Sequence, residues 1–256
     1  MFSARNKARV TAAGAVLALT AGLGAVTAVT SAQAATPSCG SSCVDVFSKQ
    51  FGTFHHPGFA LDTLSQGKKI GQPQILFRTS NSDPAEDYTV SYQGTVSDFF
   101  AAGLVSSAVE LHYGGAIFPN VPSGNLLYPN DFAYEIQYSP FGVDSGLCAG
   151  LTSTAFAGEK VSLQPCGVSA KTVWIIDTAG SPATITHGYV PLVNGSDTNF
   201  SHPYVLHYPS GYPTDKPRVQ LDVTAITGFS QGTPPGPVLG SVNSNQLWGA
   251  DLGPLK

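Results

Sequence analysis

Residues 146–175 contain three short runs in a fixed order: GLCAG at 146–150, VSLQPC at 161–166 and TVWI at 172–175. The runs are mostly apolar, and a turn with Gly158 separates the first two, which is typical of a hairpin followed by a further strand. The same order occurs once before this stretch and once after it. The corresponding runs are 59–62, 75–77 and 86–90, and then 203–206, 219–221 and 245–248. Three related units in one chain predict a repeated all-β architecture.

A further candidate strand precedes each unit, at 44–47, 134–138 and 189–193, so the units extend over about 43–92, 134–178 and 189–253. The chain has 28 Gly and 19 Pro, and no 12-residue stretch has a convincing helical period. We therefore expect two insertions, at about 91–133 and 225–241, with the apolar run 109–113 as a strand in the first. The alternative is a generic β-sandwich or barrel whose strands only look alike.

Cys148 and Cys166 lie on successive runs of the second unit, and Gln246-Leu247-Trp248 ends the third. Trp174 and Tyr88 keep an aromatic residue at the corresponding places. In these features the chain resembles the ricin-type β-trefoil lectins, which repeat a Cys-Leu-Asp-like strand, a second half-cystine and a Gln-x-Trp motif. The resemblance implies a β-trefoil-like domain, and we expect the three aromatic rings to be buried where the units meet.

In ricin-type sites an Asp on the Cys-Leu-Asp-like strand accepts hydrogen bonds from sugar hydroxyls, and an aromatic ring stacks on the sugar. Asp62 matches that Asp, whereas the second unit has Gly150 and the third has His207. The resemblance therefore implies at most one intact sugar site. The other candidate binding residues, placed by rough alignment, are Phe77, Asn81 and Asp87. The alternative is a trefoil that serves only as a scaffold.

The first 34 residues have the organisation of a secretory signal peptide. Three basic residues occur within residues 5–9, an uncharged apolar stretch covers 10–29, and Ala32-Gln33-Ala34 supplies the small-x-small cleavage pattern. A membrane anchor is the alternative, but Ala and Gly make the stretch weakly hydrophobic. We expect cleavage after Ala34, secretion of a single domain at 35–256, and no membrane association, because no second apolar run of spanning length follows.

Charge and cysteine content narrow the classes of partner. Without the signal peptide, nine basic residues remain against sixteen acidic ones, which argues against nucleic acid as a binding partner.

Four cysteines in an oxidising compartment predict two disulfides. Three connectivities are allowed, and we expect the local pairs Cys39–Cys43 and Cys148–Cys166. The six histidines form no helical zinc pattern, so we predict neither a metal nor a cofactor.

Enzyme-like motifs are weak. Residues 228–232 read GFSQG, but a proline-rich segment follows Ser230 where a nucleophile elbow requires a helix. Cys148 lies in a similar motif, yet a disulfide would remove its thiolate. Glu110 and Glu135, on apolar runs, form the pair of carboxylates that we would test first for glycoside hydrolysis.

The sequence favours a secreted carbohydrate-binding, lectin-like protein whose partner is a glycan or another extracellular polymer. One alternative is an extracellular hydrolase with its site in or beside the 91–133 insertion. Another is an inhibitor or partner-binding trefoil that uses loops such as 233–237.

Overall fold

The structure is a computed structural model that describes residues 43–54, 56, 58–79, 83–115, 131–177, 188–209, 218–230, 236–237 and 242–252. The chain divides into two units, 1–35 and 36–256, and all described residues lie in the second. The predicted signal peptide, Cys39, Asn81 and the loop 233–235 lie outside the described residues.

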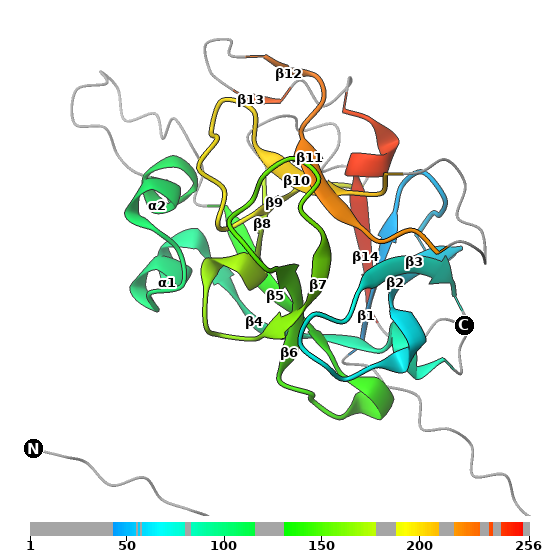
Figure 1. The fold of residues 1–256 in the computed structure, drawn as a ribbon. Helices are drawn as coiled ribbons and strands as arrows, with labels where there is room; N and C mark the ends of the chain where they lie inside the picture. Colours follow the sequence, from blue (N-terminus) through cyan, green and yellow to red (C-terminus); the bar gives the residue numbers. More distant parts are fainter. Residues whose placement is uncertain are drawn as a thin grey trace, which may run out of the picture. The chain divides into compact units, whose positions relative to one another are not determined.

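Six strands, labelled in Figure 1, are joined by pairing into a closed ring. They are β1 (Val44–Ser48), β4 (Tyr88–Thr95), β5 (Phe132–Tyr138), β8 (Val173–Ile176), β9 (Leu192–Asn194) and β14 (Trp248–Leu252). Antiparallel ladders join β14 to β1, β4 to β5, β5 to β8, and β8 to β9. Isolated bridges close the two remaining gaps, Cys43 with Thr89 and Val190 with Trp248. The ring is therefore a six-stranded antiparallel barrel.

Three hairpins cover one end of this barrel. They are β2 (Phe59–Thr63) with β3 (Gln74–Arg78), β6 (Leu147–Leu151) with β7 (Val161–Pro165), and β10 (Tyr204–His207) with β11 (Asp222–Ala225). Each hairpin bridges the next, through Pro73 with Ser162, Lys160 with Asp222, and Gln220 with Ile75. Pro73, Lys160 and Gln220 occupy equivalent places in the three hairpins, and each bridges the residue that lies two places after the equivalent one in a neighbouring hairpin. The three hairpins are therefore related by an approximate threefold symmetry and form a triangle.

A six-stranded barrel with a triangle of three hairpins is the β-trefoil arrangement. The predicted all-β, trefoil-like fold is confirmed, and a sandwich of two open sheets is excluded because the ring closes on itself.

The repeated aromatic residues lie in the core as predicted. Tyr88 and Trp174 are fully buried and Trp248 is 1% exposed. The Trp174 indole N–H donates to the Ala149 carbonyl at 2.9 Å, and the Trp248 indole N–H donates to the Leu206 carbonyl at 2.8 Å. Each indole thus joins the last barrel strand of its unit to that unit's hairpin, and satisfies a buried polar group in doing so.

The first insertion contains two helices, α1 (Val96–Ala101) and α2 (Ser107–Tyr113), so the prediction of a strand at 109–113 is wrong. Local caps decide the outcome. The Ser106 hydroxyl accepts the Val109 N–H at the start of α2, and Val109 and Tyr113 are buried one turn apart, which is a helical spacing. Five residues that alternate apolar and polar side chains are too few to exclude a short helix, and the cap that precedes them favours the helix.

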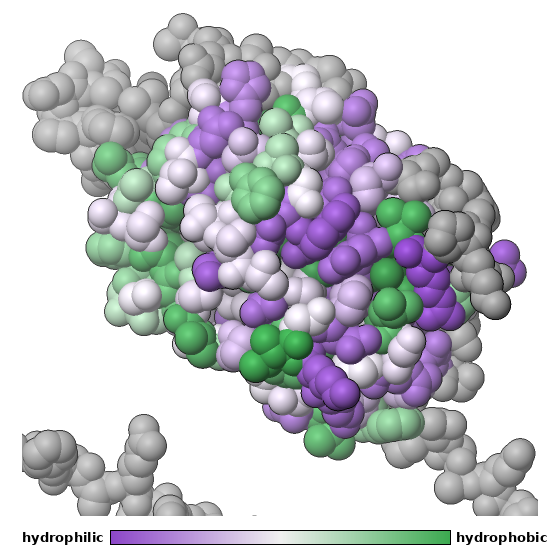
Figure 2. Space-filling model, in the orientation of Figure 1, coloured by the Kyte–Doolittle hydropathy of each residue, from purple (hydrophilic) through white to green (hydrophobic). Residues whose placement is uncertain are grey.

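The surface over the insertion is partly apolar. Figure 2 shows hydrophobic residues gathered over the region of α1 and α2. Among them, Phe100 is 42% and Leu111 50% exposed, on the sides of the helices that do not enter the core.

The second insertion contributes a short ladder of β12 (Phe229–Ser230) and β13 (Gly236–Pro237). Ser230 ends β12, and residues 231–235, which would form the other half of a nucleophile elbow, lie outside the described residues.

The predicted disulfide between Cys148 and Cys166 is confirmed, with a Cα–Cα distance of 5.1 Å. It joins the start of β6 to the residue after β7. Cys43 is also disulfide-bonded, but its predicted partner Cys39 lies outside the described residues. In the parts of the chain that the structure describes, no helix has the length and apolar character needed to cross a bilayer.

Candidate functional site

The threefold hairpin triangle defines equivalent positions in the three units. Ile75, Ser162 and Asp222 occupy one such position, because each takes part in the same inter-hairpin bridge. Their partners within the hairpins are Asp62, Gly150 and His207. The structure therefore places at one threefold-related position the three residues that the sequence comparison aligned.

A second repeated feature lies beside this position. A single 3-10 turn precedes the last barrel strand of each unit, at Pro84–Glu86, Ala170–Thr172 and Ser244–Gln246. The residue two places before the buried aromatic is Glu86 in the first unit, Thr172 in the second and Gln246 in the third. The polar groups next to the hairpin position thus differ from unit to unit.

At the third unit's position, side chains from two units form a connected polar cluster, which we call the His207 cluster: His207, Asp222 and Asn245 of the third unit and Lys160 of the second. The Asp222 carboxylate lies 2.8 Å from His207 Nδ1 and 2.9 Å from Lys160 Nζ. The Asn245 side-chain amide donates to the Tyr208 carbonyl at 3.1 Å and lies 2.9 Å from His207 Nε2. Because that amide nitrogen is a donor, Nε2 accepts, and Nδ1–H donates to Asp222.

The His207 cluster is accessible to a ligand. The side chains of Lys160, His207 and Asp222 are 50%, 18% and 9% exposed, so the cluster runs from the buried hairpin out to solvent. It presents an ammonium donor, a carboxylate acceptor and an imidazole within one hydrogen-bonded group. Of these residues the sequence analysis singled out only His207. Asp222 and Lys160 come from different units, which no local motif connects.

In the first unit the same position is acidic and closed. Asp62 is 1% and Glu86 5% exposed, and their carboxylates and that of Asp83 offer oxygen atoms that all lie within 4.8 Å of one another. We call these three residues the Asp62 cluster. Burial raises the pKa of Asp62 to about 7, Asp83 adds to the rise, and the Arg218 guanidinium opposes it.

Phe77, another predicted binding residue, lies beside Asp62 but is partly covered. Phe77 pairs with Ala60 across the hairpin while Asp62 pairs with Ile75, so Phe77 and Asp62 share a face of the hairpin. The Arg218 guanidinium lies 4.3 Å from the centre of the Phe77 ring, and covers one of its faces.

Asp87 accepts the backbone N–H of Phe141 at 2.7 Å, and burial is the main cause of its raised pKa. Asn81 lies outside the described residues. The sequence comparison missed Asp83 and Glu86 as neighbours of Asp62; the signal was the pair of carboxylates in the turn before Tyr88.

The two candidate catalytic carboxylates have separate structural partners. Glu135 lies on β5, is 1% exposed, and accepts the Gly167 N–H at 2.8 Å and the Thr172 hydroxyl at 2.5 Å. Glu110 lies on α2 and accepts the Ser97 hydroxyl at 3.2 Å. Nothing in these contacts brings the two into a common cleft, and an acid–base role for them stays a prediction.

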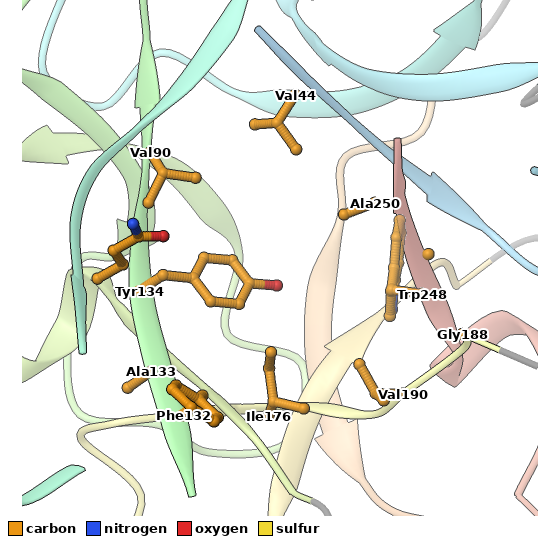
Figure 3. A pocket seen from close by; sticks show the side chains of 12 residues that line it. Val44, Val90, Phe132, Ala133, Tyr134, Ile176, Gly188, Val190, Trp248 and Ala250 are labelled. Atoms are coloured by element: carbon orange, nitrogen blue, oxygen red, sulfur yellow. The ribbon is translucent and has the colours of Figure 1, made fainter. Parts of the chain in front are cut away.

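A cavity of about 520 Å³ lies among the barrel strands (Figure 3). Its lining includes Val44, Val90, Ile176, Val190 and Trp248, and Tyr134 points into it with its hydroxyl. Burial raises the pKa of this hydroxyl. A sugar needs several converging hydrogen-bonding groups, so this mostly apolar cavity suits it less well than the His207 cluster.

No model of a known protein family matches the chain. No curated protein matches it either. Among solved structures, a designed threefold-symmetric protein, ThreeFoil, is 12% identical, with 82% of this chain and 97% of that chain covered and a TM-score of 0.47.

A mosquitocidal holotoxin is 13% identical, with a TM-score of 0.46, and an exo-β-1,3-galactanase from Clostridium thermocellum is 12% identical, with a TM-score of 0.44. Both matches cover 82% of this chain, but the chain spans only 17% and 30% of the length of those two proteins.

Proposed function

We propose that this chain is a secreted, non-catalytic, lectin-like protein that binds carbohydrate. The observation that carries the proposal is the His207 cluster. It occupies the threefold position at which ricin-type lectins, which the sequence resembles, hold the residue that contacts sugar.

The chemistry of the cluster suits hydroxyl groups. Asp222 accepts hydrogen bonds, Lys160 donates them, and the bond from Asn245 holds the His207 ring in a fixed tautomer and orientation. Charge-assisted hydrogen bonds of this kind are stronger than neutral ones, and a fixed arrangement of donors and acceptors distinguishes one hydroxyl stereochemistry from another.

The first unit is a second contact point in the proposal. Asp62 is the residue that matches the lectin Asp, with Phe77 on the same face. Because Asp62 is 1% exposed and Arg218 covers Phe77, a sugar would have to displace Arg218 to reach them. We therefore expect the His207 cluster to be the stronger site, and Asp62→Ala to reduce retention as well.

The test is retention of the disulfide-bonded protein on polysaccharide resins and on a glycan array. We expect wild type to bind at least one glycan, and His207→Ala and Lys160→Ala to weaken binding by about tenfold, as expected for the loss of one charge-assisted contact. Lys69→Ala, which removes an exposed lysine whose side chain makes no hydrogen bond or ion pair with the cluster among the described residues, is the matched control and should bind normally. Absence of binding to every glycan, or equal losses in the control, would end the proposal.

The secretion part has its own measurement. Mass spectrometry of the exported protein should give an N-terminus at Ala35, because the small-x-small pattern ends at Ala34. A cell-associated chain that keeps residues 1–34 would contradict it.

A further inference from the structure

The Asp62 cluster concentrates three carboxylates in a small, mostly buried volume. Asp62 projects from β2, Asp83 caps the 3-10 turn Pro84–Glu86, and Glu86 ends that turn. One oxygen from each lies within 4.8 Å of the other two. Three like charges at this spacing repel one another strongly where water is excluded, so they need a compensating charge or a proton.

Among the described residues, one oxygen of Asp62 lacks this compensation. Its Oδ1 atom is buried and has no hydrogen-bond partner among the residues that the structure describes, in a side chain that is 1% exposed. A buried carboxylate oxygen without a partner carries a substantial free-energy cost. The carboxylate of Asp62 thus combines an unpartnered buried oxygen with two further carboxylates within reach of one ion.

The surrounding groups do not remove this need. Asp83 Oδ1 accepts the Ala85 N–H and the Gln66 amide, both at 3.0 Å, which fixes the carboxylate in place. Arg218 lowers the electrostatic cost of Asp62, but it stacks on Phe77, and no ion pair joins it to Asp62 among the described residues. Tyr88, which is also close, bonds to Thr63 and Gln74.

The threefold comparison shows that the acidic residues are not required by the fold. At the place of Glu86 the third unit has Gln246, whose amide accepts the Thr227 N–H at 2.9 Å and donates to the Ala225 carbonyl at 2.9 Å. The second unit has Thr172 there, and Gly150 in place of Asp62. The second and third units therefore fold without a carboxylate at the positions of Asp62 and Glu86. The first unit alone has a carboxylate at both positions.

We propose that Asp62, Asp83 and Glu86 form a binding site for a hard divalent cation, Ca²⁺. Carboxylate oxygens without any His or Cys ligand fit a hard cation and not zinc. Ca²⁺ tolerates an irregular ligand set, which suits three carboxylates brought together by a strand and a turn, whereas Mg²⁺ requires near-ideal octahedral geometry. This inference does not rest on carbohydrate binding.

The experiment uses the full disulfide-bonded chain and Ca²⁺ alone, without glycan. Thermal unfolding and calorimetric titration are measured from about 0.1 to 10 mM CaCl₂, a range that brackets the affinities of extracellular calcium modules, against an EDTA control. We expect the unfolding temperature of wild type to rise with Ca²⁺, because a ligand bound by the native state alone stabilises it.

Three conservative variants test the ligands. Asp62→Asn keeps the shape of the side chain, Asp83→Asn keeps a good N-cap, and Glu86→Gln introduces the residue type that the third unit has. Each should weaken Ca²⁺ binding by on the order of tenfold or more, since a carboxylate ligand is lost. If Asp62→Asn does not fold, the other two still decide the matter.

The matched control is Asp45→Asn, which removes another buried carboxylate that is 8% exposed and has acidic neighbours but does not belong to the cluster. It should bind Ca²⁺ like wild type. The proposal is overturned if Ca²⁺ does not stabilise wild type, if the three cluster variants respond as wild type does, or if the control loses the response equally. Because no glycan is present, failure here is distinguishable from failure of the lectin proposal.

Discussion

Replacing Asp45 by Asn should make the protein more stable above neutral pH. Asp45 lies on β1, is 8% exposed, and faces Asp251 across the ladder with β14. Burial raises its pKa to about 7, and the charges of Asp251 and Asp87 add to the rise. At pH 8 the native protein therefore carries a buried charge that the fold disfavours.

The sign and size follow from proton linkage. Between about pH 4 and pH 7 the native state keeps a proton on Asp45 that the unfolded chain has released, so the free energy of unfolding falls as pH rises. A shift from 3.8 to about 7 corresponds to about 4 kcal/mol at most, at about 1.4 kcal/mol per pKa unit. Asp45→Asn lacks this loss, so it should match wild type near pH 4 and exceed it by about 1–4 kcal/mol at pH 8.

Urea unfolding at pH 4.5 and pH 8, in EDTA so that no cation occupies the Asp62 cluster, measures this difference. Asp62 titrates in both proteins, and its contribution cancels. Asp144→Asn, which removes an exposed carboxylate, is the control and should leave the pH profile unchanged. The reasoning is refuted if Asp45→Asn and wild type lose stability in parallel between the two pH values.

Two further predictions concern the core. Replacing both Cys148 and Cys166 by Ala opens a link with a sequence separation of 18, and should lower the free energy of unfolding by about 3 kcal/mol in the chain-entropy model; equal urea midpoints for both proteins would contradict it. Trp174→Phe removes the indole bond to the Ala149 carbonyl and leaves a buried acceptor and a small cavity, so it should cost about 2–4 kcal/mol in the same assay. A loss below about 1 kcal/mol would mean that the carbonyl finds another donor.

The sequence predicted the parts of the fold that repeat. The runs around Cys148 and Trp174, and their counterparts, gave the strands of the three units and the buried aromatic positions, because alternation, turn residues and large rings are local signals. The prediction of a strand at 109–113 was wrong because it relied on a local signal alone. Residues 109–113 alternate apolar and polar side chains, which is a strand signal, but five residues are too few to exclude a helix. The Ser106 cap, which the prediction did not weigh, favours the helix.

The candidate sites were less predictable. Asp62 and His207 were aligned correctly from the repeats, since their bridges relate them by the threefold arrangement. Their neighbours could not be found in this way. Lys160 reaches Asp222 across 62 positions of sequence, and that contact exists only because one hairpin packs on the next.

By itself, the sequence determined that the chain is all-β and that it contains three units, and it favoured the Cys148–Cys166 pair among three possible connectivities, which the structure then confirmed. These follow from short-range patterns of apolar residues, turns and cysteine spacing. Only the tertiary structure decided which unit is open and which is closed. Closure of the three hairpins into a triangle joins His207 to residues from other elements, and in the first unit it buries Asp62 beside two carboxylates. Burial and nearby charges together set the pKa of such a carboxylate, and the residues that cause both effects are distant from it in the chain. The sequence alone therefore could not show them.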